Sequence, residues 1–419
     1  MTSATTSERL SSAALAEAHE GSRSLVARTP VLSAGSISAH CGGTVVVKAE
    51  NLQRTGSFKL RGALNKLRHL EPGVHGVVAG SAGNHAQSLA YAARSGGLRC
   101  EVFMPVAAAV SKVSAVRAFG ASVEQQADSV DECVALARER AHEAGLAFVH
   151  PFDDELIIAG QAGVGIELAE DVAELSTVIV PVGGGGLASG VALAVKARHP
   201  GVRVIGVQAA ACAPFPESLR AGRPLETGPA VTIADGIAIK RPGEITLPLL
   251  SELLDDFVTV EEAAIAEAMV LLLERAKLVV EGAGAAGVAA LLSGAVKPDA
   301  NGVTAVILSG GNVDAALLAG LATRHETEAG RRIRLLTRVP DRPGGLAGLL
   351  TLIAQDGVNV LSVEHVRDGM PLGVRQTGVE LILETRGREH GAELLGDLRR
   401  HGYDLVEVPY PEVTGTPAL

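Results

Sequence analysis

The sequence of 419 residues contains no tryptophan, and aromatic residues make up only 2% of it. Recognition of nucleic-acid bases by aromatic stacking is therefore a weak prospect. Basic residues are also too few to give the chain a positive charge. It contains 37 Lys and Arg and 47 Asp and Glu, and its net charge is −10. Without a long basic run to bind phosphates, we expect no nucleic-acid partner, and an acidic soluble enzyme is the simpler interpretation.

Cysteine is scarce as well, and no Cys-x-x-Cys pair occurs among Cys41, Cys100, Cys133 and Cys212. This spacing predicts neither a zinc site nor a disulfide framework, and reduced thiols are typical of a cytoplasmic protein. The N-terminal segment has no apolar core of the kind that signal peptides carry. The most apolar stretch, residues 282–296, is too short to span a bilayer, so it predicts a buried helix and no membrane partner.

What the sequence does contain is hydrophobic runs that alternate with amphipathic stretches, over a length that indicates two or three domains. The runs predict buried parallel strands at 45–48, 76–80, 100–104, 177–182, 202–208 and 303–310, and the amphipathic stretches include 131–144 and 261–277. This alternation favours an α/β architecture with open parallel sheets. Glycine-rich turns follow three of the strands, which predicts one shared ligand crevice at the strand ends.

The pattern changes after about residue 320. A charged stretch at 323–330 is typical of a linker. Strand-like and helical segments then follow in the order β-α-β-β-α-β, at 333–339, 344–357, 358–367, 378–386, 388–402 and 403–408. This order is the ferredoxin-like plan, and a tail of about 80 residues is long enough for a separate domain.

The motif SFKLRGA (57–63) carries the strongest local signal. Lys59 stands between Phe58 and Leu60 at a glycine-flanked helix start. An ordinary surface lysine is the alternative, because most lysines are exposed. A partly desolvated amine, however, has a lowered pKa and is nucleophilic enough to form a Schiff base. We therefore treat Lys59 as the candidate nucleophile.

The motif PVGGGGL (181–187) follows a predicted buried strand and precedes a predicted helix. Such a loop can turn its backbone amides inward, toward the positive end of the helix, and cradle a phosphate. The alternative is a plain flexible turn. The motif is not a Walker loop, because no Gly-Lys-Ser/Thr follows the glycines.

Two further polar turns follow strands. SAGNHAQ (81–87) opens a helix, where free amides could hold a carboxylate and Asn84 could donate to a phenolate oxygen; helix capping is the alternative. SGGN (309–312) closes the run VTAVILS, and an ordinary strand-to-helix turn is its alternative.

Together these motifs resemble the serine/threonine dehydratases among the fold type II pyridoxal-phosphate enzymes. The resemblance runs from about Arg28 to Ala322, through ARTPVLSAGSIS, SFKLRGA, SAGNHAQ, PVGGGGL, ADGIAI, EGAGA and SGGN in the family's order. It implies a two-domain catalytic unit at 1–322, with the smaller α/β domain inserted at about 60–150. It also implies pyridoxal 5'-phosphate as cofactor and a homodimer or homotetramer.

The resemblance assigns roles residue by residue. Lys59 would hold the cofactor as a Schiff base and take the substrate's α-proton, Phe58 would flank the ring, Asn84 would bind the 3-oxygen and Ser309 would meet the pyridine nitrogen. The phosphate would lie on the backbone amides of Gly183, Gly184, Gly185, Gly186 and Leu187. Ser81, Gly83, Asn84 and His85 would bind the substrate carboxylate, and Gly236 and Glu281 would line the cofactor.

The implied reaction is β-elimination from L-threonine to 2-oxobutanoate and ammonia, with L-serine to pyruvate alongside it. Alternatives are a serine or threo-3-hydroxyaspartate ammonia-lyase and a β-replacing synthase, whose usual Asp-Arg pair is absent where Leu60-Arg61 stands. A non-catalytic amino-acid sensor on the same fold is the alternative from another class. Isoleucine synthesis and threonine catabolism both remain open as pathways.

Three features of the sequence depart from relatives. Serine racemases resembling this family carry a second serine where Ala82 stands, so racemisation is disfavoured. The segment 208–213, QAAACA, offers none of the carboxylates that metal-binding relatives use, so we expect no metal site. Ala162 replaces a glycine common in relatives, without an evident consequence.

The tail at 331–410 resembles an ACT domain through VPDRPGGLAGLL (339–350) and GVNVLSVEHVR (357–367). That resemblance implies a regulatory module that binds an amino-acid effector such as isoleucine or valine. A dimerisation module without a ligand is the alternative.

Overall fold

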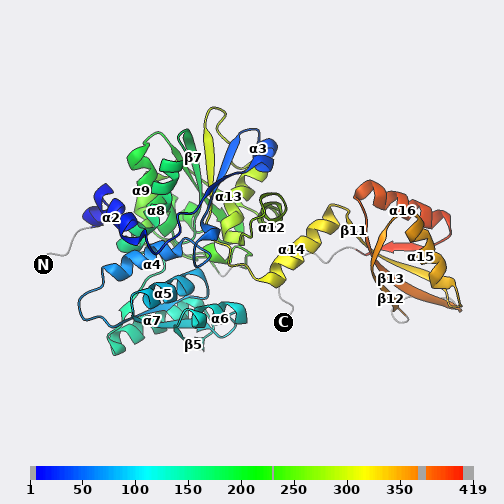
Figure 1. Cartoon of the computed structure of the whole chain (residues 1–419), viewed down its shortest axis with the longest axis horizontal. Helices are drawn as coiled ribbons and strands as arrows, with labels where there is room; N and C mark the ends of the chain where they lie inside the picture. The colour runs from blue at the N-terminus through cyan, green and yellow to red at the C-terminus, as the bar shows by residue number, and fades with distance from the viewer. Residues whose placement is uncertain (1–5, 229–230, 367–373, 409–419) are drawn as a thin grey trace. The chain divides into compact units, whose positions relative to one another are not determined.

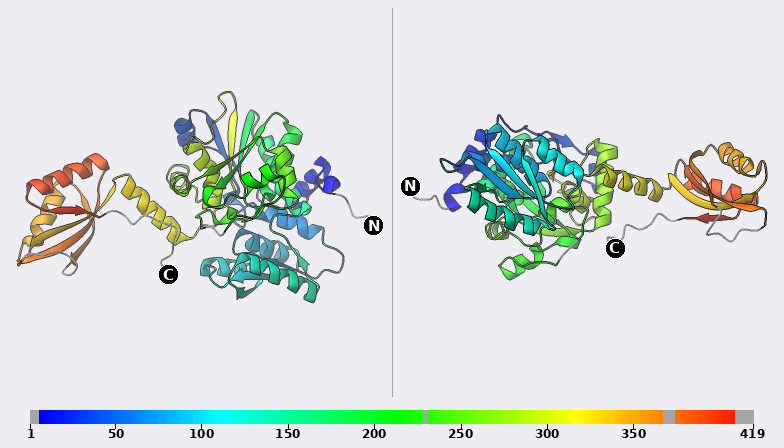
Figure 2. Two further views of the ribbon diagram at one scale, coloured as in Figure 1. Left: turned by 180° about the vertical axis from the view of Figure 1, so that it is seen from behind. Right: turned by 90° about the horizontal axis from the view of Figure 1, so that it is seen from below.

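The computed structural model describes residues 6–228, 231–366 and 374–408. Its contacts divide the chain into two compact units, Met1–Asp314 and Ala315–Leu419, which are treated separately below (Figure 1). The first unit contains two α/β lobes, each built on its own sheet (Figure 2).

The larger lobe contains a six-stranded sheet in the order β1-β2-β10-β7-β8-β9. All its neighbouring strands are parallel except the edge pair β1 and β2. The strands are β1 (Val31–Ser33), β2 (Thr44–Ala49), β7 (Leu175–Pro181), β8 (Arg203–Ala209), β9 (Asp256–Val260) and β10 (Val303–Leu308). The short antiparallel strand β1 and the half-exposed strand β9 were not predicted from the sequence.

Helices cover both faces of this sheet because successive strand residues point to opposite sides. Val178 and Val180 of β7 join a core with α8 (Glu155–Asp171), α9 (Gly186–Arg198) and α11 (Thr246–Leu253). Ile179 faces the other way, toward Gly287 of α13 (Gly282–Leu292). The apolar stretch that begins at residue 282 is thus a buried helix, as predicted, and no helix within the described ranges is long and apolar enough to cross a membrane.

The smaller lobe contains a four-stranded parallel sheet in the order β5-β4-β3-β6. Its strands are β3 (Gly76–Gly80), β4 (Arg99–Pro105), β5 (Ser122–Ala127) and β6 (Ala147–Phe148). Helices α5 (Asn84–Ser95) and α6 (Val110–Ala118) share one apolar core with the sheet, and α7 (Val130–Ala144) contributes to another. Helix α4 (Lys59–Arg68) precedes this lobe and contacts both α5 and α8.

Short elements complete the first unit. They are α1 (Thr6–Arg9), α2 (Ser12–Ser22), α3 (Gly35–Cys41), α10 (Phe215–Ala221), α12 (Glu262–Leu271), the 3-10 turns η1 (Glu50–Leu52), η2 (Ala210–Cys212) and η3 (Asp235–Ile237), and the π-helical turn η4 (Leu272–Ala276).

The second unit confirms the predicted ferredoxin-like plan. After α14 (Ala315–Glu328), its elements are β11 (Arg332–Pro340), α15 (Gly345–Gln355), β12 (Asn359–Val366), β13 (Gln376–Glu384), α16 (Arg388–Arg400) and β14 (Leu405–Glu407). The antiparallel sheet has the order β12-β13-β11-β14, and both helices contribute to its single core. Where the sequence predicts a linker from 323 to 330, the structure has the second half of α14; the expected domain end at 410 lies outside the described residues.

Candidate active site

Four motifs far apart in the sequence come together at the carboxyl ends of the strands. The backbone N–H of Phe58 donates to the Ser309 carbonyl at 3.1 Å, and Ser57 and Gly310 form an isolated bridge. Asn84 Nδ2 donates to Glu281 Oε1 at 2.7 Å. The turns after β3 and β10 therefore lie beside the segment that leads into α4.

Lys59 is the first residue of α4, and its amine is partly enclosed. Its Nζ donates to the carbonyl of Pro151 at 2.7 Å and lies 5.3 Å from the centroid of the Phe58 ring. Burial lowers the pKa of Lys59 to about 8, against the opposing charge of Glu281, which raises it. At pH 7 about a tenth of this amine is therefore uncharged, far more than of an ordinary lysine, and the uncharged form is the one that a nucleophile or base requires.

Glu281 anchors a chain of side-chain amides. Besides the bond from Asn84, Asn312 Nδ2 donates to Asn84 Oδ1 at 2.6 Å and to the Thr55 carbonyl at 2.9 Å. Burial and the nearby Asp235 raise the pKa of Glu281 to about 7, in spite of the Asn84 bond, which lowers it. The side-chain orientation of Asn84 is thus held from both ends. Asn312 was not among the predicted site residues, although its motif was.

The loop at 183–186 is tightly packed, which argues against a plain flexible turn. A Cβ on Gly184 would overlap the Phe152 ring, and one on Gly186 would lie 2.8 Å from the Phe152 carbonyl oxygen. Gly185 has φ +100°, which favours glycine, and Thr246 Oγ1 donates to the Gly184 carbonyl at 2.6 Å. Helix α9 begins directly after this bend, so its N-terminal amides open toward the loop, as predicted.

The segment HPFD (150–153) links the lysine to this loop, and sequence reasoning missed it. Pro151 accepts the bond from Lys59, and Phe152 packs on the glycines. Asp153 accepts backbone N–H bonds from residues 244, 245 and 246 at 2.9, 3.0 and 3.3 Å. The available signal was a polar-aromatic cluster directly after β6, but HPFD has neither the glycines nor the residue spacing of a known cofactor-binding motif.

The turn at 81–85 opens α5, for which Gly83 is the N-cap residue. Ser81 Oγ accepts the Gly83 N–H at 3.3 Å, which shapes the turn. His85 is buried, and its Nε2 lies 3.0 Å from the Val149 carbonyl oxygen. Burial, helped by the charge of Lys59, lowers the pKa of His85 to about 3. A carboxylate in this turn would therefore meet backbone amides at the start of α5 and no positive charge on His85.

The remaining predicted residues lie beside these groups. Ser309 is buried after β10 and adjoins Phe58. Gly236 lies in η3, where a Cβ would come within 3.2 Å of Glu281 Oε1, and Leu187 is buried in the first turn of α9. A Cβ on Gly183 would lie 3.4 Å from the Gly236 carbonyl oxygen, so the glycine loop and η3 adjoin each other.

A desolvated amine next to a glycine cradle at the edge of a parallel sheet defines an enzyme that holds an anionic, amine-reactive group. The chain belongs to the family of pyridoxal-phosphate-dependent enzymes, whose sequence profile matches residues 23–310. Its cofactor is accordingly pyridoxal phosphate.

Individual proteins agree with this assignment. The chain is 43% identical to an L-threonine ammonia-lyase of Geobacter sulfurreducens over 94% of this chain and 98% of that protein. It is also 43% identical to an L-threonine ammonia-lyase of Thermotoga maritima, over 93% and 97%. Among solved structures, maize serine racemase matches with TM-score 0.70 and 36% identity over 75% of this chain and 97% of that one.

The residues present fit the cofactor. Its aldehyde requires an uncharged amine, which Lys59 supplies. Its phosphate requires converging amides without side chains, and any Cβ on Gly184 or Gly186 would intrude on the walls of that cradle. In addition, the buried Oγ of Ser57, two residues before Lys59, has no hydrogen-bond partner within the described part of the chain. Among these described residues no cluster of His, Cys, Asp and Glu could hold a metal ion.

Proposed function

We propose that this protein is an L-threonine ammonia-lyase that converts L-threonine to 2-oxobutanoate and ammonia and also accepts L-serine, giving pyruvate. The observation that carries the proposal is the 43% identity to two L-threonine ammonia-lyases over nearly the whole chain, combined with the lowered pKa of the Lys59 amine. When bound, pyridoxal phosphate supplies the electron sink that stabilises negative charge at the substrate's α-carbon.

The chain's own residues would bind and orient the cofactor. The backbone amides of Gly183 to Leu187 would hold the phosphate, and Phe58 would flank the ring. Asn84 would donate to the 3-oxygen, with its orientation held by Glu281 and Asn312. Ser309 would meet the ring nitrogen as a neutral partner. Gly236 and Glu281 would complete the wall of the cofactor site.

Lys59 moves the proton. With its pKa near 8, Nζ is partly uncharged at neutral pH and can accept the α-proton of the substrate. Ser81, Gly83, Asn84 and His85 would hold the substrate carboxylate beside it. The turn can do so through its N–H groups at the start of α5. Because the neutral imidazole of His85 already gives its Nε2 hydrogen to the Val149 carbonyl, His85 would contribute its backbone N–H rather than its side chain.

The proposal is tested by Lys59→Ala, assayed for oxo-acid release from threonine and for the visible absorbance of cofactor-loaded protein. Both should disappear, and borohydride should fix the cofactor to Lys59 only in the wild type. Lys66→Ala is the matched control, since Lys66 lies on the same helix but pairs with Asp154 at 2.5 Å. Retention of both signals by Lys59→Ala would refute the assignment. A wild type without oxo-acid production would favour the non-catalytic sensor.

Substrate choice is decided by steady-state rates on threonine, serine and threo-3-hydroxyaspartate, with threonine expected to have the highest kcat/KM. Hydroxyaspartate would need a cation for its second carboxylate. Racemisation of serine is expected to be absent because Ala82 offers no hydroxyl on the second face. Formation of D-serine would contradict this expectation.

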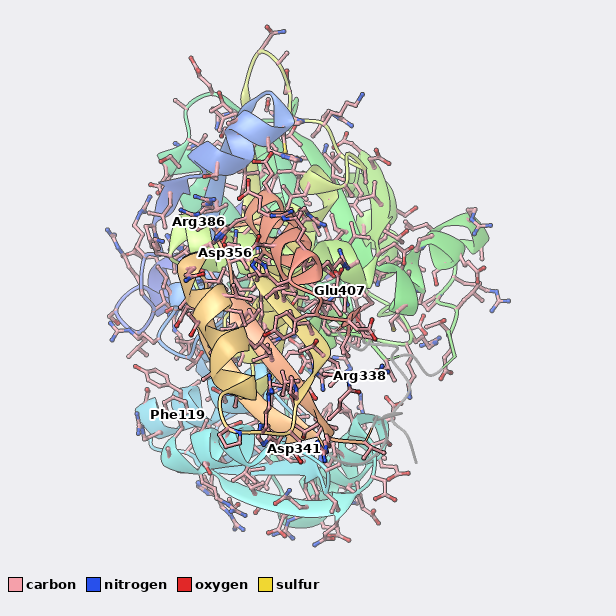
Figure 3. The ribbon with its side chains drawn as sticks, turned by 90° about the vertical axis from the view of Figure 1, so that its right-hand side faces the viewer. Phe119, Arg338, Asp341, Asp356, Arg386 and Glu407 are labelled. Carbon is pink, nitrogen blue, oxygen red and sulfur yellow. The ribbon has the colours of Figure 1, made fainter. Side chains whose placement is uncertain are left out.

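For the C-terminal unit we propose an ACT-type regulatory domain that binds an amino acid such as isoleucine or valine. The fold supports this, and so does the turn between β11 and α15, which contains Asp341 (Figure 3). In that turn Gly344 has φ +89° and a Cβ on Gly345 would clash with the Pro340 carbonyl, so the glycine pair is required there. Oxo-acid release with and without isoleucine tests the proposal; inhibition would favour isoleucine synthesis over threonine catabolism.

We further propose a catalytic unit at 1–322, with the smaller domain at about 60–150, and a cytoplasmic homodimer or homotetramer. Light scattering of the purified protein tests the assembly. A monomer at micromolar concentration would contradict it.

A further inference from the structure

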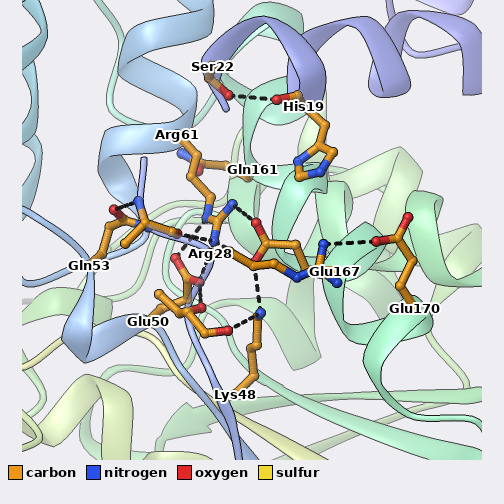
Figure 4. Close-up of polar contacts among 12 residues, drawn as sticks. His19, Ser22, Arg28, Lys48, Glu50, Gln53, Arg61, Gln161, Glu167 and Glu170 are labelled. Carbon is orange, nitrogen blue, oxygen red and sulfur yellow. Dashed lines mark hydrogen bonds and ion pairs between the residues drawn. The ribbon is translucent and has the colours of Figure 1, made fainter. Parts of the chain in front are cut away.

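Behind the candidate active site lies a cluster of four buried charges, Lys48, Glu50, Arg61 and Glu167. Each is at most 1% exposed. Arg61 donates to Glu50 through Nε at 2.9 Å and Nη2 at 2.8 Å, and to Glu167 through Nη1 at 2.7 Å and Nη2 at 2.9 Å (Figure 4). Lys48 Nζ donates to Glu167 at 2.7 Å. Two cations and two anions leave this quartet neutral.

Stability alone is a poor reason for such a cluster. Removing charges from water costs free energy that their mutual attraction repays only with good geometry, and apolar residues of similar volume often serve as well. The best-attested use of a buried ionic group is to fix the register of one element against another. The geometry here suits that use, because each carboxylate receives two hydrogen bonds from the planar guanidinium of Arg61.

Arg61 belongs to the first turn of α4, two residues after Lys59. Successive residues of an α-helix are about 100° apart around the axis, so these two side chains point to nearly opposite sides. Arg61 therefore holds the helix from behind while Lys59 faces the site. Its two carboxylate partners lie in the larger lobe, since Glu50 directly follows β2 and Glu167 lies on α8.

The same turn contacts α8 through its backbone. Gly62 N–H donates to Gln161 Oε1 at 3.2 Å, and a Cβ on Gly160 would lie 2.6 Å from the Gly62 Cα. Because neither Gly62 nor Gly160 has a side chain, the two helices touch here through their backbones, without interlocking side chains to fix the rotation of α4. Asn65 Nδ2 holds the next turn by donating to the Leu156 carbonyl at 2.7 Å. The four bonds of Arg61 add a buried, charged hold on the same rotation.

We propose that Arg61 is a positioning residue for Lys59: by binding Glu50 and Glu167 together, it sets the rotation of α4 that aims the reactive amine. This proposal rests on the role proposed above for Lys59. The amine lies about 7 Å from the helix axis, so a rotation of about 10° displaces it by about 1 Å. A displacement of that size can lower the rate about 100-fold without a change in substrate binding.

The test compares Arg61→Lys and Glu50→Gln with Lys48→Met in the cofactor-loaded full chain. Lysine keeps the charge of Arg61 but cannot bind two carboxylates in the same planar fork. Lys48 is equally buried and shares Glu167, but it lies on β2 rather than on the helix of Lys59. Lys48→Met therefore disturbs the charge balance without releasing α4.

For Arg61→Lys we expect kcat on threonine to fall roughly 100-fold, with KM changed by less than about threefold. The visible absorbance maximum should shift, and the share of cofactor that borohydride fixes to Lys59 should fall. Glu50→Gln should show the same signature in weaker form. Lys48→Met should lower the urea midpoint but keep kcat within about threefold and leave the spectrum unchanged.

The proposal is overturned if Arg61→Lys retains the wild-type kcat and spectrum, or if kcat in all three variants simply follows their loss of stability. An inactive wild type in which borohydride fixes no cofactor would instead refute the role of Lys59. The two failures are therefore distinguishable.

Discussion

Acid should destabilise the catalytic unit through its buried imidazoles, and the clearest contribution should come from His85, whose pKa burial lowers further than that of His150. This side chain is 3% exposed, and because the Val149 carbonyl can only accept, its Nε2 carries the hydrogen. The perturbation is His85→Gln, whose side-chain amide can donate to the same carbonyl but cannot take up a proton.

The size of the loss in unfolding free energy follows from the pKa of His85, which burial lowers from 6.5 to about 3. The folded state therefore binds fewer protons than the unfolded chain, and stability is lost as the pH falls below 6.5. Each pH unit between the two pKa values costs about 1.4 kcal/mol. Between pH 7 and pH 5 the wild type should lose about 2 kcal/mol of unfolding free energy through this residue alone.

The assay is urea denaturation followed by far-ultraviolet circular dichroism at both pH values. The loss between pH 7 and 5 should be about 2 kcal/mol smaller in His85→Gln than in the wild type. His142→Gln is the control, because His142 is exposed on α7 and its replacement should alter stability by less than about 0.5 kcal/mol. Equal losses in wild type and His85→Gln would refute the reasoning.

Three further outcomes follow from the site. Gly184→Ala should weaken the affinity for pyridoxal phosphate roughly 10- to 100-fold in a titration of the apoprotein, because the new Cβ would overlap the Phe152 ring. Gly35→Ala is the control: its Cβ would meet open space, so the affinity should not change. Asn312→Ala should lower kcat about tenfold and shift the cofactor's visible spectrum, because Asn84 loses the partner of its Oδ1; an unchanged spectrum would contradict this. Dialysis against a chelator should leave oxo-acid production unchanged, and recovery of activity on adding a divalent cation would show a metal requirement that we do not expect.

The sequence predicted most of the framework because each motif joins a local signal to a local cause. A buried hydrophobic run followed by glycines correctly predicted β7 and the start of α9, and the ferredoxin-like order followed from periodicity alone. By contrast, strand β5 has alternating half-buried residues and a polar composition, so it offered no hydrophobic run to recognise. The strand ends that meet at the site could be predicted since parallel strands share an edge.

The parts that could not be predicted depend on contacts between distant residues. Phe152 acquires its role by packing on a loop much later in the sequence, and Asn312 by reaching back to Asn84. Lys48 appeared in the sequence only as the polar end of a strand run, yet it is completely buried against Glu167. These contacts cannot be predicted from the sequence, because each joins residues that lie far apart along the chain. Polar residues such as Asn312 and Lys48 have the character of ordinary surface residues in the sequence.

The charges around α4 also explain how the buried quartet can lie close to the Lys59 amine, which must lose its proton to react. Burial and Glu281 are the causes that set the pKa of Lys59, and the quartet is not among them. Its two positive and two negative groups cancel at a distance, and the helix lies between them and the amine. Glu50→Gln would leave the cluster with a net positive charge, which should lower the pKa of Lys59 further. If the rate of the apoprotein's reaction with an amine-directed reagent at Lys59 depends on pH in the same way in Glu50→Gln and wild type, charge cancellation is not what allows this arrangement.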